Sequence, residues 1–148
     1  MPQDHPLLQT QLQGCYALML GLKTPWPHSW IGAKCEQSPL GWISVNSSKP
    51  GRDAQLTSIV AHSTHEWATA HLEDDLTEVQ AQLLAAFTAL TGISAREALH
   101  ANTHRWRYAL VHNPSKSGFY CDSEQQLAAV GDWSVTSRIE EVWFASDE

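Results

Sequence analysis

The apolar positions of residues 76–91 recur every three or four residues, which is the spacing of one face of an α-helix. Asp74 and Asp75 precede this stretch and are candidate N-terminal caps, and Gly92 follows it as a C-terminal stop. The alanines of the stretch also favour a helix. We therefore predict one long helix over about residues 74–91. Its apolar face consists of Leu76, Val79, Leu83, Phe87 and Leu90.

Shorter apolar or alternating runs, separated by Gly, Pro, Ser and Asp, predict β-strands. Residues 5–13 are predicted as a short helix and residues 66–72 as a helical turn. Several strands with few crossover helices predict an α+β fold, in which a mainly antiparallel sheet is covered on one side by the long helix. The predicted strands are residues 15–22, 30–35, 42–46, 56–63, 98–112, 119–121 and 127–130.

The strand around Trp106 alternates between aromatic and basic side chains. Its alternation places His104, Trp106 and Tyr108 on one face and Arg105 and Arg107 on the other. One interpretation is an aromatic platform flanked by guanidinium groups that bind anions. The other is a core tryptophan with solvated arginines on the opposite face, and the spacing alone favours this second interpretation.

The C-terminal segment predicts a buried strand, a turn and a helix. The apolar run 127–130 ends at Gly131 and Asp132, and Ser137 and Glu140 have the spacing of a capping box at a helix start. A turn before a helix N-terminus favours anions, and an Asp there can accept hydrogen bonds from sugar hydroxyls. The alternative is an ordinary connection, which this segment alone favours. The expected helix face is Ile139, Val142 and Trp143.

Composition and charge exclude several classes of partner. The length of 148 residues suits one domain, and the net charge of −7 argues against a nucleic-acid surface. Cys15, Cys35 and Cys121 form no CxxC pair, so we expect neither a disulfide framework nor a thiolate zinc site. The N-terminus does not resemble a signal peptide, and no apolar run is long enough to cross a membrane. We therefore expect a cytoplasmic protein.

Histidines offer candidate chemistry with competing interpretations. His62 follows an apolar strand and precedes a polar turn, where functional residues often lie, although a partly buried structural histidine fits equally well. His62, His65 and His71 could bind a metal, but a histidine that ends a strand need not converge with the others, so we expect no metal. His100 and His104 share a strand face rather than a helix face.

Loops rich in Pro and Gly carry further candidates. Trp26, Trp30 and Trp42 lie in such surroundings and could line a cleft or belong to the core. Lys49 and Arg52 lie in a Pro-Gly loop that could bind phosphate, although two exposed charges more often only increase solubility. The sequence contains no GxSxG, GxGxxG, P-loop or HExxH motif.

Several segments occur together in an order that resembles a known family. The segments are CYALMLGL, SPLGWISVNSSKPGR, SIVAHSTHEWATAHLE, the predicted long helix, HRWRYALV and VGDWSVTSRIEEVW. From about Gly14 to Trp143 the set resembles the C-terminal portion of renalase-like, FAD-dependent oxidoreductases of the flavin amine oxidase class. The resemblance implies that residues 1–126 form a substrate-binding domain. Residues 127–148 would then be a strand–turn–helix remnant of a Rossmann-type FAD domain.

The resemblance also assigns residues to sites. Gly131, Asp132 and Trp133 match the turn that meets the ribityl or pyrophosphate region of FAD. His62 and Trp106 match residues that line the flavin-side pocket. We add Trp42 as a further substrate-side residue, and Arg107 from its charge, as a group that could meet a substrate phosphate. No catalytic residue is assigned, because in such enzymes the cofactor carries the hydride chemistry.

The implied reaction is hydride transfer from a small or dihydronicotinamide-type substrate to FAD, which O2 then reoxidises. The chain lacks the GxGxxG turn, so we expect weak or no FAD binding and no activity by this chain alone. A dinucleotide-binding partner half or a homodimer would supply what is missing. The alternative is a non-catalytic ligand-binding or interaction module with this fold. The apolar residues expected to be exposed, repacked or buried in a dimer are Leu127, Val130, Ile139, Val142 and Trp143.

Overall fold

The computed structural model describes residues 10–52, 55–115, 118–134 and 143. The chain divides into two compact units, one of residues 14–107 and one that joins residues 1–13 to residues 108–148. Each unit is described by itself. The boundary expected between residues 126 and 127 stays a prediction, because it concerns which part of a larger protein each segment would join. The capping box of Ser137 and Glu140 lies outside the described residues, as do Ile139 and Val142.

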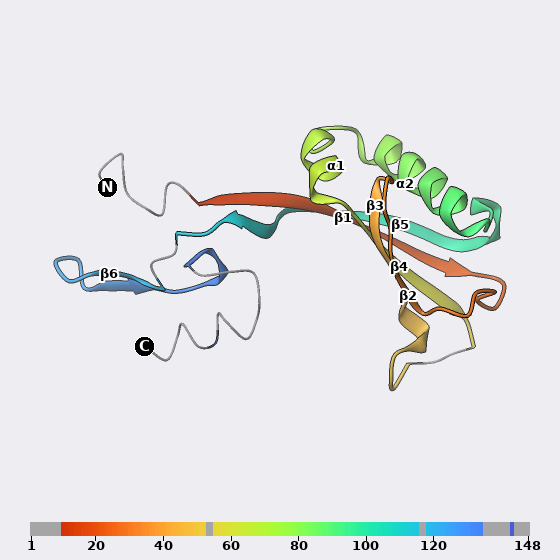
Figure 1. The fold of residues 1–148 in the computed structure, drawn as a ribbon, viewed down its shortest axis with the longest axis horizontal. Helices are drawn as coiled ribbons and strands as arrows, with labels where there is room; N and C mark the ends of the chain where they lie inside the picture. The colour runs from red at the N-terminus through yellow and green to blue at the C-terminus, as the bar shows by residue number, and fades with distance from the viewer. Residues whose placement is uncertain (1–9, 53–54, 116–117, 135–142, 144–148) are drawn as a thin grey trace. The chain divides into compact units, whose positions relative to one another are not determined.

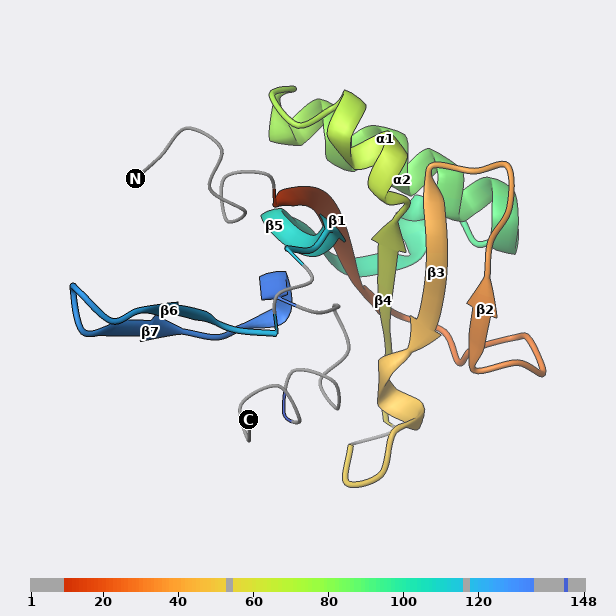
Figure 2. The same ribbon diagram turned by 60° about the vertical axis from the view of Figure 1, so that its left-hand side comes forward.

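A five-stranded sheet in the order β2-β3-β4-β1-β5 forms the framework. The pairs β2–β3, β3–β4 and β1–β4 are antiparallel, and Figure 2 shows β2, β3 and β4 side by side. The mainly antiparallel, α+β prediction is therefore confirmed. β1 already begins at Gln11, so the predicted helix over residues 5–13 is wrong at its end. The strands are β1 (Gln11–Leu22), β2 (Gly32–Lys34), β3 (Leu40–Val45), β4 (Thr57–Ser63) and β5 (Ala98–Asn113).

Two helices, α1 (His65–Ala70) and α2 (Leu76–Thr91), lie on one side of this sheet, as Figure 1 shows. Both helices therefore cover this face of the sheet, whereas the sequence predicted one long helix alone. The Asp75 carboxylate accepts hydrogen bonds from the backbone N–H groups of Thr77 and Glu78, and α2 ends at Gly92 with a φ of 73°. A left-handed φ suits glycine, which has no Cβ. Thr64 caps α1, and two short 3-10 turns are η2 (Asn46–Ser48) and η3 (Ala95–Glu97).

The hydrophobic core lies between the sheet and α2. Val79, Leu83 and Phe87 are buried, whereas Leu76 and Leu90 at the ends of the helix are exposed. The buried part of the apolar face of α2 is therefore shorter than the sequence pattern predicts. Leu84 is partly buried against the core. The strand residues of this core are Tyr16, Leu18, Leu20, Leu22, Leu40, Ile43, Val45, Ile59 and Ala61.

The second unit contains a hairpin in which β6 (Tyr120–Asp122) pairs with β7 (Leu127–Ala129) in antiparallel register. The strand predicted over residues 127–130 exists but is not buried, because the side chain of Leu127 is 50% exposed and that of Val130 is exposed too. The side chain of Trp143, which was expected on the helix after the turn, is also exposed. A two-stranded hairpin lacks a second layer of its own to bury an apolar run. A 3-10 turn, η4 (Asp132–Ser134), follows it, so a Rossmann-type ending is not confirmed.

Within the described residues, no helix has the length and apolarity needed to cross a bilayer.

Candidate functional site

His62 lies in the middle of the sheet, opposite Trp42 on β3 and Ala17 on β1. In β4 the buried residues Ile59 and Ala61, which belong to the core, alternate with partly buried ones. His62 therefore points to the face opposite α1 and α2. Because directly opposed residues of antiparallel strands share a face, Trp42 lies on this face as well.

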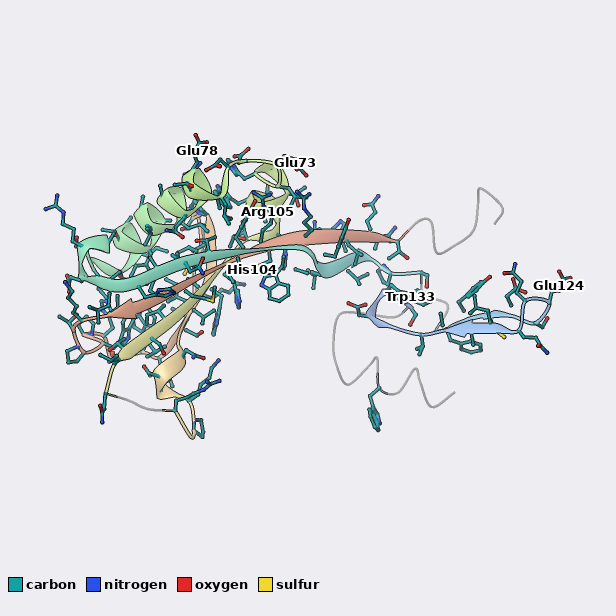
Figure 3. The ribbon with its side chains drawn as sticks, turned by 180° about the vertical axis from the view of Figure 1, so that it is seen from behind. Glu73, Glu78, His104, Arg105, Glu124 and Trp133 are labelled. Carbon is teal, nitrogen blue, oxygen red and sulfur yellow. The ribbon has the colours of Figure 1, made fainter. Side chains whose placement is uncertain are left out.

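The strand β5 contributes two more side chains to the same face. A Cβ placed at Gly21 would lie 3.6 Å from the Cβ of His100, and Gly21 opposes Ser58, which is on the face of His62. By strand alternation, His104 and Trp106 share that face. Figure 3 shows His104 and Arg105 leaving β5 on opposite sides, with Arg105 on the side of the helices.

We call the surface formed by Trp42, His62, His104 and Trp106 the open face. The rings of His104 and Trp106 meet edge to face with centroids 4.4 Å apart. Trp106 is 54% exposed and Trp42 is 43% exposed, so neither is a core residue. The interpretation of Trp106 as a core tryptophan is therefore wrong. The described residues bring three predicted site residues, His62, Trp42 and Trp106, to one face of one sheet.

Partial burial controls the charge of His62. Burial lowers the pKa of its imidazole below the ordinary value, and the Lys49 ammonium and His65 lower this pKa further. His62 is therefore biased toward the neutral form, in which one ring nitrogen donates and the other accepts a hydrogen bond. Such an imidazole can orient a polar ligand or exchange a proton with it.

Arg105 and Arg107 lie on the helix side and do not flank Trp106. The guanidinium of Arg107 donates to both carboxylate oxygens of Glu73, at 2.6 and 3.0 Å. The Nε of Arg105 donates to the hydroxyl of Tyr16 at 2.8 Å. The anion-binding platform is therefore not formed as predicted, because both guanidinium groups are engaged on the other face. A substrate role for Arg107 stays a prediction, although the strand places it away from His62.

The other predicted tryptophans have a different environment. Trp26 and Trp30 pack against the core with ring centroids 4.8 Å apart, and His28 stacks on Trp30 at 5.3 Å. The Nε1 of Trp26 donates to the carbonyl of Trp30, and the Nε2 of His28 lies 3.0 Å from the carbonyl of Thr91. His28 thus contacts the last residue of α2, and Trp26 and Trp30, which pack against the core, fit the core interpretation. No sequence pattern had indicated that His28 would take part in this cluster.

The Gly131–Trp133 turn of the second unit is closed on itself. The backbone N–H of Trp133 donates to the Asp132 carboxylate, and the N–H of Ser134 donates to the Gly131 carbonyl, both at 2.9 Å. A Cβ at Gly131 would lie 2.7 Å from the Nε1 of Trp133, so the indole packs onto the glycine. In this form the N–H groups of Trp133 and Ser134 already have acceptors and are not available to a pyrophosphate, and the role in FAD binding expected for this turn stays a prediction.

His65 and His71, two of the three candidate metal ligands, have separate partners. The Nδ1 of His65 lies 2.9 Å from the carbonyl of Gly14, and the Nδ1 of His71 lies 2.6 Å from a carboxylate oxygen of Asp74. In the part of the chain that the structure describes, no group of three or more His, Cys, Asp or Glu side chains is arranged to hold a metal ion.

Known proteins share this fold over part of their length. No family model matches the sequence. A protein assigned as a protoporphyrinogen oxidase from Exiguobacterium sp. 255-15 is similar in structure, with a TM-score of 0.64, 14% identity, and coverage of 79% of this chain and 28% of its own.

Structures of putrescine oxidase, from work on the redesign of its cofactor binding, are similar too. The A394C mutant has a TM-score of 0.55 at 20% identity, and the wild type bound to putrescine has 0.52 at 18%. Each match covers 70% of this chain and 23% of the oxidase. The chain thus spans about a quarter of the length of these proteins, and the likeness establishes a fold shared with part of them.

Proposed function

We propose that this chain is the substrate- and flavin-covering part of an FAD-dependent oxidoreductase of the flavin amine oxidase class. A renalase-like enzyme acting on a small or dihydronicotinamide-type substrate is the specific form of this proposal. The observation that carries it is the combination of an oxidase-like fold with three predicted pocket residues on one open face. We further propose that the protein works in the cytoplasm and that this chain alone is inactive without a dinucleotide-binding half.

The open face suits a flat aromatic ligand. The indoles of Trp42 and Trp106 are exposed, and the row across the sheet from Trp42 through His62 leads to the small side chain of Ala17. Aromatic rings bind other rings through offset or edge-to-face contacts. A neutral His62 adds one donor and one acceptor to this apolar surface. The face would therefore position a planar ring and fix its orientation with one hydrogen bond.

Most of the contacts to FAD would come from the partner half. The sequence has no GxGxxG turn, and the N–H groups of Trp133 and Ser134 are engaged in hydrogen bonds within their own turn. When bound, FAD would accept the hydride from the substrate and pass the electrons to O2. The role of this chain would be to orient the ring and to exclude water from it. The exposed Leu127, Val130 and Trp143 are the residues that a partner half or a second copy would cover.

The experiment is reconstitution with a dinucleotide-binding half. A neighbouring reading frame that encodes a GxGxxG flavoprotein half would be co-expressed with this chain and the complex purified. We expect a stoichiometric complex, saturable FAD with a perturbed absorbance spectrum, and O2 consumption with an oxidisable substrate. The variants His62→Ala and Trp106→Ala should lose most of this activity, whereas Arg96→Gln, at an exposed position, serves as the control. A complex without flavin, or variants as active as the wild type, would overturn the proposal.

A non-catalytic ligand-binding module is the second candidate. The Gly131–Trp133 turn favours it, because the N–H groups of Trp133 and Ser134 have acceptors within the turn without a cofactor. This candidate predicts that a planar ligand perturbs the nuclear magnetic resonances of His62 and Trp106 in the isolated chain. It also predicts that FAD does not bind at any concentration, with or without a partner half.

A further inference from the structure

We infer that Arg105 is a positioning residue, which holds the part of β5 that presents His104 and Trp106 on the open face. Its anchor is the buried Tyr16 on β1, together with the connection between α1 and α2. The importance of the open face rests on the proposed function. The positioning itself can be tested without any flavin.

The side chain of Arg105 contacts Tyr16 and the helix connection at once. Its Nε donates to the Tyr16 hydroxyl at 2.8 Å, and its Nη2 donates to the carbonyl of Asp74. The guanidinium carbon also lies 5.6 Å from the centroid of the Tyr16 ring. A planar guanidinium can hold two acceptors in fixed directions, so these contacts define the position of the side chain and of its backbone.

Tyr16 is itself fixed from several sides. Its side chain is 0% exposed, and its hydroxyl donates to the carbonyl of His71 at 2.8 Å. Its ring meets the Trp67 indole edge to face at 5.8 Å, and Trp67 lies 4.3 Å from the His71 ring. A tyrosine with a packed ring and a hydroxyl that both donates and accepts is a rigid anchor.

The backbones also approach closely at this point. A Cβ added at Gly14 would lie 3.0 Å from the Cδ1 of Leu72 and 3.3 Å from the carbonyl oxygen of Trp106. Glycine at this position therefore leaves room for β1, β5 and the helix connection to meet. Close packing at this junction leaves β5 little freedom to shift along its neighbour.

The geometry of a strand transmits this restraint to the open face. Arg105 lies between His104 and Trp106, and successive side chains of a strand point to opposite sides. A fixed Arg105 on the helix side therefore sets the directions of both neighbours on the other side. Figure 3 shows His104 on the side of β5 opposite Arg105. β5 is the last strand in the sheet order, so side-chain anchors replace the restraint of a second neighbouring strand.

Arg107 offers a contrast on the same side of β5. Its partner Glu73 is exposed, and the ion pair lies at the surface. Exposed ion pairs contribute little, because water screens them and long side chains lose entropy in forming them. Arg105 has a buried partner and a backbone carbonyl instead. We therefore assign the positioning to Arg105 and use the Glu73 pair as the matched control.

The test reads the mutual position of the His104 and Trp106 rings in the full chain by nuclear magnetic resonance. The Trp106 indole should displace the chemical shifts of the His104 ring protons from those of a histidine without an aromatic neighbour, because the two ring centroids are only 4.4 Å apart. In Arg105→Gln we expect at least half of this displacement to be lost. Arg105→Lys should restore part of it, because an ammonium can replace one of the two hydrogen bonds. Glu73→Gln should leave the displacement unchanged.

Tyr16→Phe provides a second variant, because it removes the acceptor of Arg105 and keeps the buried ring. It should also lose part of the displacement, which keeps the test decisive if Arg105→Gln does not fold. Wild-type displacements in folded Arg105→Gln or in Tyr16→Phe would overturn the inference. The same loss in Glu73→Gln would overturn it too. Failure of the flavin reconstitution would refute the proposed function and leave this result unaffected.

Discussion

His62 on β4 and Trp42 on β3 are directly opposed across an antiparallel pair, on the face of the sheet opposite α1 and α2. His62 is partly buried at this position, and burial is the largest cause of the lowered pKa of its imidazole. The opposed pair gives the open face an aromatic indole, from Trp42, and an imidazole, from His62. In its neutral form this imidazole carries one hydrogen-bond donor and one acceptor.

The titration of His62 should be visible in the stability of the protein. Its pKa in the folded state lies below the ordinary value of 6.5, so the unfolded chain binds this proton more readily. Stability from this group is complete above pH 6.5 and falls as the pH decreases toward the folded pKa. His62→Gln should show a smaller loss of stability than the wild type between pH 7.5 and 5.5 in urea titrations. A His62 pKa at or above 6.5, measured by nuclear magnetic resonance, would contradict this.

The hydroxyl of Tyr16 should contribute measurably to stability. Tyr16→Phe leaves the Nε of Arg105 and the carbonyl of His71 without this partner, at a site that is largely removed from water. We expect a loss of about 1–3 kcal/mol in the free energy of unfolding. Tyr108→Phe is the control, because that ring is 77% exposed, and it should change stability by about 0.5 kcal/mol or less. Equal effects of the two substitutions would contradict the buried role of Tyr16.

The two ends of the apolar stripe on α2 should differ from its centre. Leu83 is fully buried, and Leu83→Ala should cost about 2–5 kcal/mol because it removes buried methyl groups and leaves a cavity. Leu90 is 42% exposed, and Leu90→Ala should cost about 1 kcal/mol at most. Urea denaturation of both variants measures the difference. Similar losses would mean that α2 packs on the sheet with a different face.

The cap of α2 should be sensitive to acid. The pKa of Asp75 lies below its ordinary value of 3.8, first because its carboxylate accepts the backbone N–H of Thr77. A lowered carboxyl pKa adds stability above the ordinary value, and this stability is lost as the pH falls through the folded pKa. Asp75→Ala should therefore lower the melting temperature at pH 7, and the difference from wild type should shrink below pH 4.

Asp75→Asn separates the cap from its charge. The amide oxygen can still accept the N–H of Thr77, so most of the helix stability should remain, but the part of the acid dependence that comes from Asp75 should disappear. A wild-type acid profile in Asp75→Asn would show that another carboxylate is responsible.

Local patterns predicted much of this molecule. The spacing of Val79, Leu83 and Phe87 gave the position of α2, and alternation placed His104 and Trp106 correctly on one face of β5. These signals are local, because they arise from the periodicities of 3.6 and 2 residues. The same reasoning misjudged residues 127–130, since an apolar run looks the same whether or not a second layer covers it.

Contacts between distant residues could not be predicted. Arg105 and Tyr16 are separated by 89 positions, and Arg107 and Glu73 by 34. Nothing around an arginine indicates that its partner is a buried tyrosine hydroxyl rather than a phosphate. His28 escaped notice for the same reason, because its acceptor is the carbonyl of Thr91 at the end of a helix remote in sequence.

The three thiols differ in accessibility, which has a practical consequence. Cys15 is buried and Cys35 is partly buried, and burial raises the pKa of both thiols, whereas Cys121 is exposed on the β6–β7 hairpin. Thiolates are the reactive form, so a maleimide dye at neutral pH should label Cys121 first. The native sequence thus already offers an attachment point for a fluorophore on the hairpin. A label there would report partner docking by energy transfer without any engineered cysteine.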